Sequence, residues 1–395
     1  MEQHTLMTLE SLATKAGVPA ALGHTLAFQH TPGTAVHFGC GAVDRVGELA
    51  RSVGGRRVLV VTDPGIEDAG HLGKIVGPLE RAGLQHVLFD AVVQNPTTVT
   101  VDACVAVARK HSIDTIIGLG GGSSMDTAKG CNFLLTNGGR MADYWGVGKA
   151  TKAMLPLIVI PTTAGTGSEC QSFALISDAT SHVKMACGDK KAAARHAILD
   201  PLLTLTMPAK VTAVTGIDAI AHAVESLVST KRNAVSADYS VAAWRMLSSA
   251  FERVMADGTD LEARALMLAG SALAGTAIEN SMLGAAHAAA NPLTATFDTP
   301  HGVAVGLMLP HVVRLNHANA EASAAYAALQ PGCDPAARLT DFLTAAGLPR
   351  SLAEAGIPTP DFQTLATQAD AQWTARFNPV TVDAAAFEAL YRAAA

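Results

Sequence analysis

The sequence is poor in charged and in aromatic residues. Of its 395 residues 16% are charged and 5% are aromatic, and the formal net charge is −6. A negative balance of this kind leaves no basic surface with which to bind nucleic acid or an anionic membrane. Hydrophobic residues make up 49% of the chain, which excludes an intrinsically disordered protein and indicates a well-packed globular one.

Paired cysteines and long apolar runs are also missing. The six cysteines form no Cys-x-x-Cys pair, which excludes a zinc ribbon or a disulfide framework and fits a reducing compartment. No unbroken apolar run reaches the roughly 20 residues of a membrane span. The first residues lack the basic-then-apolar pattern of a signal peptide. We therefore expect a cytoplasmic protein whose partners include neither nucleic acid nor a membrane.

The pattern of the chain changes near residue 205, and its length favours two domains. Before this point short apolar segments alternate with helical stretches, which predicts a parallel sheet covered on both faces. The expected strands are 35–38, 57–62, 86–90, 115–119 and 155–160. After it only helical patterns remain, rich in Ala, Leu and Met. The expected helices are 213–229, 234–256, 261–280, 303–318, 335–346 and 384–393. We predict an N-terminal extension at 1–33, an α/β domain at 34–205 and an all-α domain at 206–395.

A glycine-rich turn follows the strand expected at 115–119. Gly120, Gly121 and Gly122 precede Ser123 and a helical stretch. The glycines let the backbone approach a ligand closely, and the free N–H groups and dipole of the helix that follows favour a pyrophosphate. The alternative is a tight turn from strand to helix that binds nothing, because the turn does not match the G-x-G-x-x-G fingerprint.

Two further strand ends favour a dinucleotide ligand. Asp63 directly follows the strand at 57–62. An acid at this place can accept hydrogen bonds from an adenosine ribose and repel a 2′-phosphate. The alternative is that Asp63 is a turn residue before Pro64. The loop 161–169 follows another strand and is rich in glycines and hydroxyl groups. Its threonines are Thr162, Thr163 and Thr166. Since ligands bind where parallel strands end, the three features together predict a dinucleotide, and Asp63 predicts NAD in preference to NADP.

The helix at 213–229 carries a candidate metal site. Asp218 and His222 are four residues apart and therefore lie on one helix face. His287 and His301 follow downstream. One carboxylate with three imidazoles suits Fe²⁺, Zn²⁺ or a similar first-row ion better than Mg²⁺ or Ca²⁺. The alternative is structural, because Thr215-x-x-Asp218 is close to a capping box and a histidine on an apolar helix is often a core residue.

Four motifs in this order carry a family resemblance. They are GGGSSMDTAK, PTTAGTGSE, TGIDAIAHAVE and PHGVAVGLMLPHV. With them the chain resembles the iron-dependent (group III) alcohol dehydrogenase family over residues 34–393. The resemblance implies an N-terminal dinucleotide-binding α/β domain with a parallel sheet and an all-α C-terminal domain, the architecture also found in dehydroquinate synthase. It further implies a metal ion between the two domains and a homodimer or a larger homo-oligomer.

The resemblance also implies roles for individual residues. The metal ligands would be Asp218, His222, His287 and His301. The coenzyme would be bound by Asp63, Asn95, Gly120, Gly121, Gly122, Ser123, Thr162, Thr163 and Thr166. Asp126 and Lys184 would lie at the coenzyme near the reacting groups; the ordinary alternatives are a helix N-terminal acid for Asp126 and a surface charge for Lys184.

The sequence departs from the family at Asn291. The family usually has a histidine here, four residues after the ligand His287, and that histidine is thought to pass protons. An asparagine can hydrogen-bond but cannot titrate near neutral pH. We therefore expect metal binding to be retained and the route of the proton to differ.

These features predict an NAD-linked, metal-dependent alcohol dehydrogenase or aldehyde reductase. Fe²⁺ is the first choice of metal and Zn²⁺ the alternative. The sequence shows no Arg/Lys cluster near the metal motifs that would bind a phosphate or carboxylate, so we expect a small neutral primary alcohol or diol and its aldehyde. Two alternatives remain open: a dehydroquinate-synthase-like lyase, and a non-catalytic protein that binds NAD and structural zinc.

Overall fold

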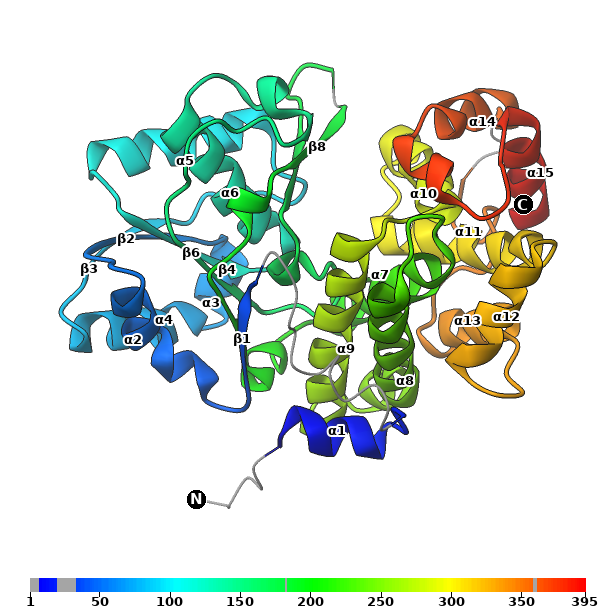
Figure 1. The fold of residues 1–395 in the computed structure, drawn as a ribbon, viewed down its shortest axis with the longest axis horizontal. Coiled ribbons are helices and arrows are strands. Elements are labelled where there is room, and N and C mark those ends of the chain that lie inside the picture. Colours follow the sequence, from blue (N-terminus) through cyan, green and yellow to red (C-terminus); the bar gives the residue numbers. More distant parts are fainter. Residues whose placement is uncertain (1–6, 20–32, 182, 358–360) are drawn as a thin grey trace. The chain divides into compact units, whose positions relative to one another are not determined.

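The computed structural model describes residues 7–19, 33–181, 183–357 and 361–395. These residues form two compact units (Figure 1). Of the described residues, unit 1 comprises 7–9, 33–163, 167–181 and 183–207, and unit 2 comprises 10–19, 164–166 and those from Pro208 to Ala395. The first helix, α1 (Leu9–Lys15), lies almost wholly in unit 2.

Unit 1 is built on a six-stranded sheet in the order β1-β9-β6-β4-β2-β3, in which every pair is parallel. The strands are β1 (Ala35–Phe38), β2 (Arg57–Val61), β3 (Gln85–Phe89), β4 (Thr115–Gly120), β6 (Leu157–Pro161) and β9 (His196–Leu199). β2, β4 and β6 are almost continuously apolar and buried, as strands covered on both faces must be. The predicted parallel sheet is thus confirmed, although β9 was not expected.

The two faces of this sheet pack against different helices. Leu59 and Val61 face a core that includes α5 (Thr98–Lys110) and α6 (Gly122–Asn137). Val58 and Val60 face a second core with α2 (Val46–Ser52) and α4 (His71–Arg81). Alternate residues of one strand therefore enter opposite cores, since side chains alternate across a strand. The short helix α3 (Pro64–Asp68) follows β2 directly.

Unit 1 also has a small sheet that the sequence did not predict. Its order is β5-β8-β7, formed by β5 (Gly146–Val147), β8 (Lys184–Gly188) and β7 (Phe173–Ser177). β7 and β8 are antiparallel. The alternating burial of β7 gives a weaker apolar signal than the continuous strands of the main sheet.

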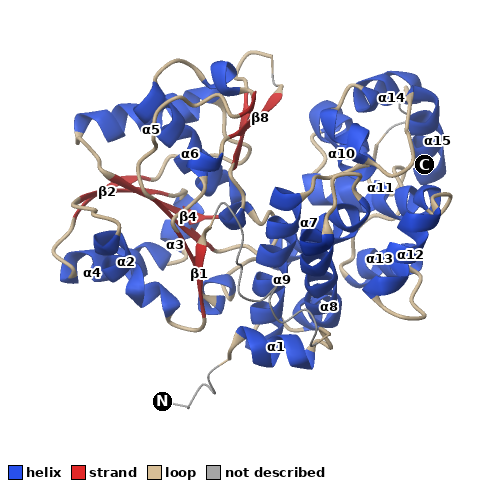
Figure 2. Cartoon of the chain, in the orientation of Figure 1, coloured by secondary structure: helices blue, strands red, loops and turns tan. Residues whose placement is uncertain are grey.

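Unit 2 is helical throughout its described residues (Figure 2). Its helices are α1, α7 (Ala209–Val228), α8 (Ala234–Ala256), α9 (Leu261–Asn280), α10 (Ala285–Phe297), α11 (His301–Asn316), α12 (Ala320–Leu329), α13 (Pro335–Ala345), α14 (Phe362–Asp370) and α15 (Ala384–Ala394). The predicted all-α C-terminal region is confirmed. The sequence did not predict α10, α12 or α14.

The centre of unit 2 is the packing of α7 against α8 and α9. Gly216 allows the close approach, because a Cβ there would lie 2.6 Å from the ring of Phe251 and 3.0 Å from Met267. α7 and α9 are apolar and long enough to pass a compositional test for membrane spans. However, 83% of the most apolar 18-residue stretch of α7 and 89% of that of α9 are buried inside the structure. Such burial is typical of core helices.

Candidate functional site

One face of α7 carries three buried functional side chains. Asp218, His222 and Glu225 follow one another at spacings of four and three residues, so they lie along one stripe of the helix. All three side chains are buried. Most of the neighbouring positions are alanine, which leaves room for other helices to approach this face.

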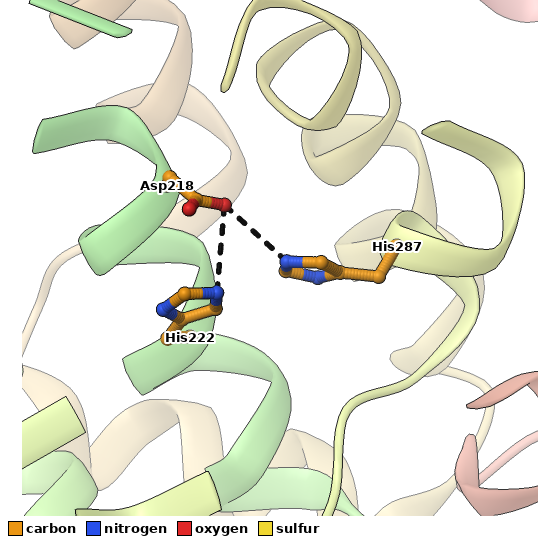
Figure 3. Close-up of side chains that lie close together, drawn as sticks. All are labelled: Asp218, His222 and His287. Carbon is orange, nitrogen blue, oxygen red and sulfur yellow. Dashed lines mark ion pairs between the residues drawn. The ribbon is translucent and has the colours of Figure 1, made fainter. Parts of the chain in front are cut away.

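Two further histidines reach the same point from other helices of unit 2. His287 lies in the first turn of α10 and His301 is the first residue of α11. Figure 3 shows the imidazoles of His222 and His287 converging on the carboxylate of Asp218. Asp218 Oδ1 lies 3.4 Å from Nε2 of His222, 3.4 Å from Nε2 of His287 and 3.8 Å from Nε2 of His301. The donor atoms of Asp218, His222 and His287 thus lie within 4.8 Å of one another, and His301, the fourth predicted ligand, faces the same carboxylate oxygen.

These separations fit a shared metal ion. Ligand atoms placed tetrahedrally at the usual bond lengths of zinc lie about 3.4 Å apart. Asp218 Oδ1 and His287 Nε2 are also buried atoms without a hydrogen-bond partner. Leaving such atoms unpaired is costly, and one cation between them would satisfy both. The side chain of His301 is 29% exposed while those of the other three are 9% exposed or less, so solvent reaches the set at His301.

The electrostatics of the cluster also favour a cation. Burial alone would raise the pKa of Asp218, but the imidazoles of His222, His287 and His301 lower it well below its usual range. Burial lowers the pKa of His222 to about 4. At His287 burial is outweighed by the carboxylates of Glu225 and Asp218, which raise its pKa to about 9. The cluster therefore attracts positive charge at the point where its donor atoms meet.

Glu225 contacts the predicted ligand His287, and sequence reasoning did not single it out. One of its carboxylate oxygens, Oε2, contacts Nδ1 of His287, and the other, Oε1, accepts a hydrogen bond from the backbone N–H of Ala286 at 2.7 Å. The spacing of seven residues from Asp218 placed Glu225 on the ligand face of α7, and this was the available signal.

In unit 1 the glycine turn has the geometry of a phosphate cradle. Gly120 has a φ of 138°, and a Cβ there would lie 2.6 Å from the hydroxyl of Ser124. Gly121 is the N-cap residue before α6 and provides no side-chain cap. A Cβ on Gly121 would lie 3.3 Å from Thr163. Close packing therefore requires glycine at both positions. Because Gly121 has no side chain, it caps none of the first backbone N–H groups of α6, which a phosphate could then bind.

Other predicted coenzyme residues lie beside this turn. Asp63 accepts a hydrogen bond from Ser124 at 3.1 Å through Oδ2, and its Oδ1 accepts one from the backbone of Ile66 at 3.2 Å. The backbone N–H of Asn95 donates to the hydroxyl of Ser123 at 3.3 Å. Asp63, Asn95 and the turn itself follow β2, β3 and β4, whose carboxyl ends share one edge of the sheet. The structure thus brings these residues together.

Buried threonine hydroxyls without partners mark the same edge. They belong to Thr162 and Thr163 after β6, and to Thr62 at the end of β2. Sequence reasoning named the first two and missed Thr62. The loop 161–169 then leaves unit 1, and its residues 164–166, including Thr166, pack with unit 2. A Cβ on Gly165 would lie 2.4 Å from Cβ of Thr215 on α7, so this loop touches the metal-bearing helix one turn before Asp218.

Asp126 belongs to a buried polar network. Its Oδ1 accepts a hydrogen bond from the Ser168 hydroxyl at 2.8 Å, and its Oδ2 accepts one from the backbone N–H of Leu175 at 3.2 Å. Burial raises the pKa of Asp126, while Lys129 and, more weakly, Lys184 oppose that shift. Asp126 therefore has the contacts of an anchor between α6 and β7, and its role at the coenzyme stays a prediction.

Lys184 and Asn291 lie in different units. Lys184 is the first residue of β8 and is paired in register with Ser177 of β7. Asn291 lies on α10 one turn after His287, and its amide donates a hydrogen bond to Oε1 of Gln372 at 3.0 Å. The roles predicted for both residues stay predictions.

Comparison with known proteins assigns the family. Residues 33–201 match the family model described as iron-containing alcohol dehydrogenase, and residues 212–395 match its C-terminal counterpart. The chain is 34% identical to alcohol dehydrogenase 4 of Schizosaccharomyces pombe, over 90% of this chain and 86% of that protein. It is 33% identical to the NAD-dependent methanol dehydrogenase of Bacillus methanolicus, over 86% and 93% of the two chains.

A solved structure supports the same assignment. The crystal structure of a 1,3-propanediol oxidoreductase matches with a TM-score of 0.88 and 34% identity, over 91% of this chain and 97% of that one. The resemblance inferred from the four sequence motifs is confirmed, and so is the prediction of an oxidoreductase that acts on CH–OH groups. The chain belongs to the iron-containing alcohol dehydrogenase family.

Proposed function

We propose that the protein is a metal-dependent, NAD-linked alcohol dehydrogenase that interconverts a small primary alcohol or diol and its aldehyde. The observation that carries the proposal is that the imidazoles of His222, His287 and His301 all face Oδ1 of Asp218, with Nε2 at 3.4, 3.4 and 3.8 Å. Fe²⁺ is the proposed metal because of the family, and Zn²⁺ fits the same mixed donor set.

When bound, the divalent ion supplies Lewis acidity that favours loss of the alcohol proton, and NAD supplies the hydride acceptor. The chain's own groups hold these partners in place. Asp218 and the imidazoles of His222, His287 and His301 would hold the metal, and the carboxylate would balance part of its charge. In unit 1 the N-terminus of α6 offers N–H groups to the pyrophosphate. Asp63 offers a carboxylate oxygen to the adenosine ribose, and its charge disfavours the 2′-phosphate of NADP.

The proton route differs from one that uses a histidine at position 291. Asn291 donates to Gln372, so its amide orients through hydrogen bonds but cannot exchange a proton near neutral pH. We propose that Asn291 and Gln372 position groups and that the proton leaves by another path. Asn291→His is then expected to alter the pH dependence of kcat, and an unchanged profile would count against this role.

Metal analysis combined with an alcohol panel tests the function. The purified protein is stripped by chelation, reloaded anaerobically with Fe²⁺ or Zn²⁺, and assayed with NAD and a series of primary alcohols and diols by absorbance at 340 nm. We expect one ion per chain, metal-dependent NADH formation, and loss of both in His287→Ala. Full activity in metal-free protein would reject the proposal, and a lyase would give no net NADH with simple alcohols.

Three finer proposals accompany this function. Asp63 favours NAD, as the name of the Bacillus methanolicus relative also suggests, and equal kcat/KM values for NAD and NADP would refute its role. We further propose a cytoplasmic location. We also propose a homodimer or larger assembly, because β1 is an edge strand with β9 as its one partner among the described residues and can pair with another chain. A monomeric mass by light scattering would exclude it.

A further inference from the structure

Glu225 makes two contacts with one short segment of α10. Through Oε2 it contacts Nδ1 of His287, and through Oε1 it accepts from the backbone N–H of Ala286 at 2.7 Å. Glu225 itself is only 3% exposed. A single carboxylate on α7 therefore binds both the side chain of a metal ligand and the backbone that carries it, across 62 residues of sequence.

The start of α10 is built to admit this carboxylate. The residue before the helix is Gly284, which provides no side-chain cap. Two side chains from other parts of unit 2 cap the helix instead. Glu225 accepts from the backbone N–H of Ala286, and Oδ1 of Asn378 accepts from the backbone N–H of Ala285 at 3.4 Å. A Cβ on Gly284 would lie 3.1 Å from Glu225 Oε1 and 3.1 Å from Asn378 Oδ1. Only glycine leaves both acceptors undisturbed, so the helix that carries His287 is fixed by groups from outside it.

The contact with Nδ1 also determines which ring nitrogen is free. A carboxylate can only accept, so it places a hydrogen on Nδ1 of His287. In the neutral ring Nε2 then keeps its lone pair, and this is the atom that lies 3.4 Å from Asp218 Oδ1. Partners of this kind orient ligand imidazoles in metalloproteins.

We propose that Glu225 is the positioning residue of the metal centre, which holds His287 in the orientation and tautomer that present Nε2 to the ion. This inference rests on the proposed function, since it assumes that the four donors bind a divalent metal. It assigns to Glu225 a role distinct from ligation, because both of its oxygens are already engaged by α10.

The variant Glu225→Gln tests the inference with little change of shape. The amide oxygen can still accept from Ala286, but the NH₂ group then faces Nδ1 of His287. Nδ1 of His287 must then accept a hydrogen bond, so the ring hydrogen moves to Nε2. A protonated Nε2 has no lone pair with which to bind the ion. We expect the affinity for Zn²⁺, measured by chelator competition, to fall about 10- to 100-fold, and the visible absorption of the Co²⁺-loaded protein to change.

Tyr391→Phe is the matched control. The hydroxyl of Tyr391 donates a buried hydrogen bond to the backbone carbonyl of Ala289 on the same helix, at 2.6 Å, and not to the ring of His287. We expect this variant to be less stable to heat and yet to keep its Zn²⁺ affinity within about twofold and its Co²⁺ spectrum unchanged, because the lost hydrogen bond does not involve the ring of His287 and leaves its tautomer unchanged.

Each outcome decides the question. Unchanged Zn²⁺ affinity and an unchanged Co²⁺ spectrum in Glu225→Gln would overturn the inference while leaving the proposed function intact. An equal loss in Tyr391→Phe would also overturn it, because general loosening of α10 would then be the cause. Failure of the wild-type protein to bind Zn²⁺ or Co²⁺ would overturn both proposals. If circular dichroism shows Glu225→Gln to be unfolded, Glu225→Asp takes its place, since its shorter carboxylate can reach only one of its two partners and is expected to weaken Zn²⁺ binding.

Discussion

Glu169 is a buried acid that destabilises the folded protein at neutral and alkaline pH. Its side chain is 1% exposed, and its Oε1 has no hydrogen-bond partner. Burial raises its pKa from 4.5 to about 7, an effect that Lys129 only partly opposes. The substitution Glu169→Gln removes the charge and keeps the shape, and we expect it to stabilise the protein more at pH 8 than at pH 5.5.

The magnitude follows from the two pKa values. Between pH 4.5 and 7 the folded chain holds a proton at Glu169 that the unfolded chain has lost. The free energy of unfolding therefore falls as the pH rises through this window. The full penalty above pH 7 is about 3 kcal/mol, and at pH 5.5 it is about 1 kcal/mol. The glutamine should therefore gain about 2 kcal/mol relative to wild type between the two pH values.

Calorimetric unfolding of both proteins at pH 5.5 and pH 8 measures this difference. Any cost of the glutamine that does not depend on pH, such as an unpaired NH₂ group, cancels between the two conditions. Glu67→Gln changes the same charge on an exposed side chain of unit 1 and serves as the control, since an exposed carboxyl is in water before and after unfolding. An effect of Glu169→Gln that is the same at both pH values would show that the folded protein does not hold the proton.

Three further substitutions test the packing around the two sites. Lys129→Met is expected to cost about 3–5 kcal/mol of unfolding free energy in urea titrations, because the buried ammonium donates to the carbonyl and the hydroxyl of Ser168 at 2.7 Å each. Gly302→Ala should cost about 1–3 kcal/mol and weaken Zn²⁺ binding in a chelator competition, because its Cβ would lie 1.9 Å from the carbonyl oxygen of Val214 and push α11 away from α7. Phe251→Ala should lower the free energy of unfolding by about 3–5 kcal/mol, since its fully buried ring fills the space beside Gly216.

The sequence predicts those elements whose signal is local. β2, β4 and β6 are buried on both faces, so an unbroken apolar run marks each of them. The helix α10 was missed for the opposite reason. Asn291-Pro292 reads as a break, yet Pro292 lies inside the helix, where the missing N–H costs stability. Packing of α10 against α11 and the caps supplied by Glu225 and Asn378 hold the helix together, and none of these contacts is visible in the local sequence.

In the candidate site, too, the sequence predicts what depends on local spacing and misses what depends on contacts between distant segments. The spacing of Asp218 and His222 predicts a common face, and the structure places them there with Oδ1 and Nε2 3.4 Å apart. The spacing also placed Glu225 on that face. Its role, however, follows from its contact with His287, which lies 62 residues away in the sequence. Likewise the sequence offered for Asp126 a place at the coenzyme or at the start of a helix, but it gave no sign of the contacts with Ser168 and Leu175 that bury the side chain in a network joining distant segments.

Metal binding and coenzyme binding rest on separate sets of contacts in this chain. All four predicted donors lie on α7, α10 and α11, and Glu225 joins two of those helices, so the arrangement of the donors is set within unit 2. The glycine turn and Asp63 are fixed by neighbouring strands within unit 1. The loop 161–169 belongs to both, since its threonines follow β6 and its residue Gly165 packs against Thr215 of α7. Substitutions in one set are therefore expected to leave the other set intact, and a methyl group added at Gly165 is expected to disturb the packing of the loop against α7, because it would lie 2.4 Å from Cβ of Thr215.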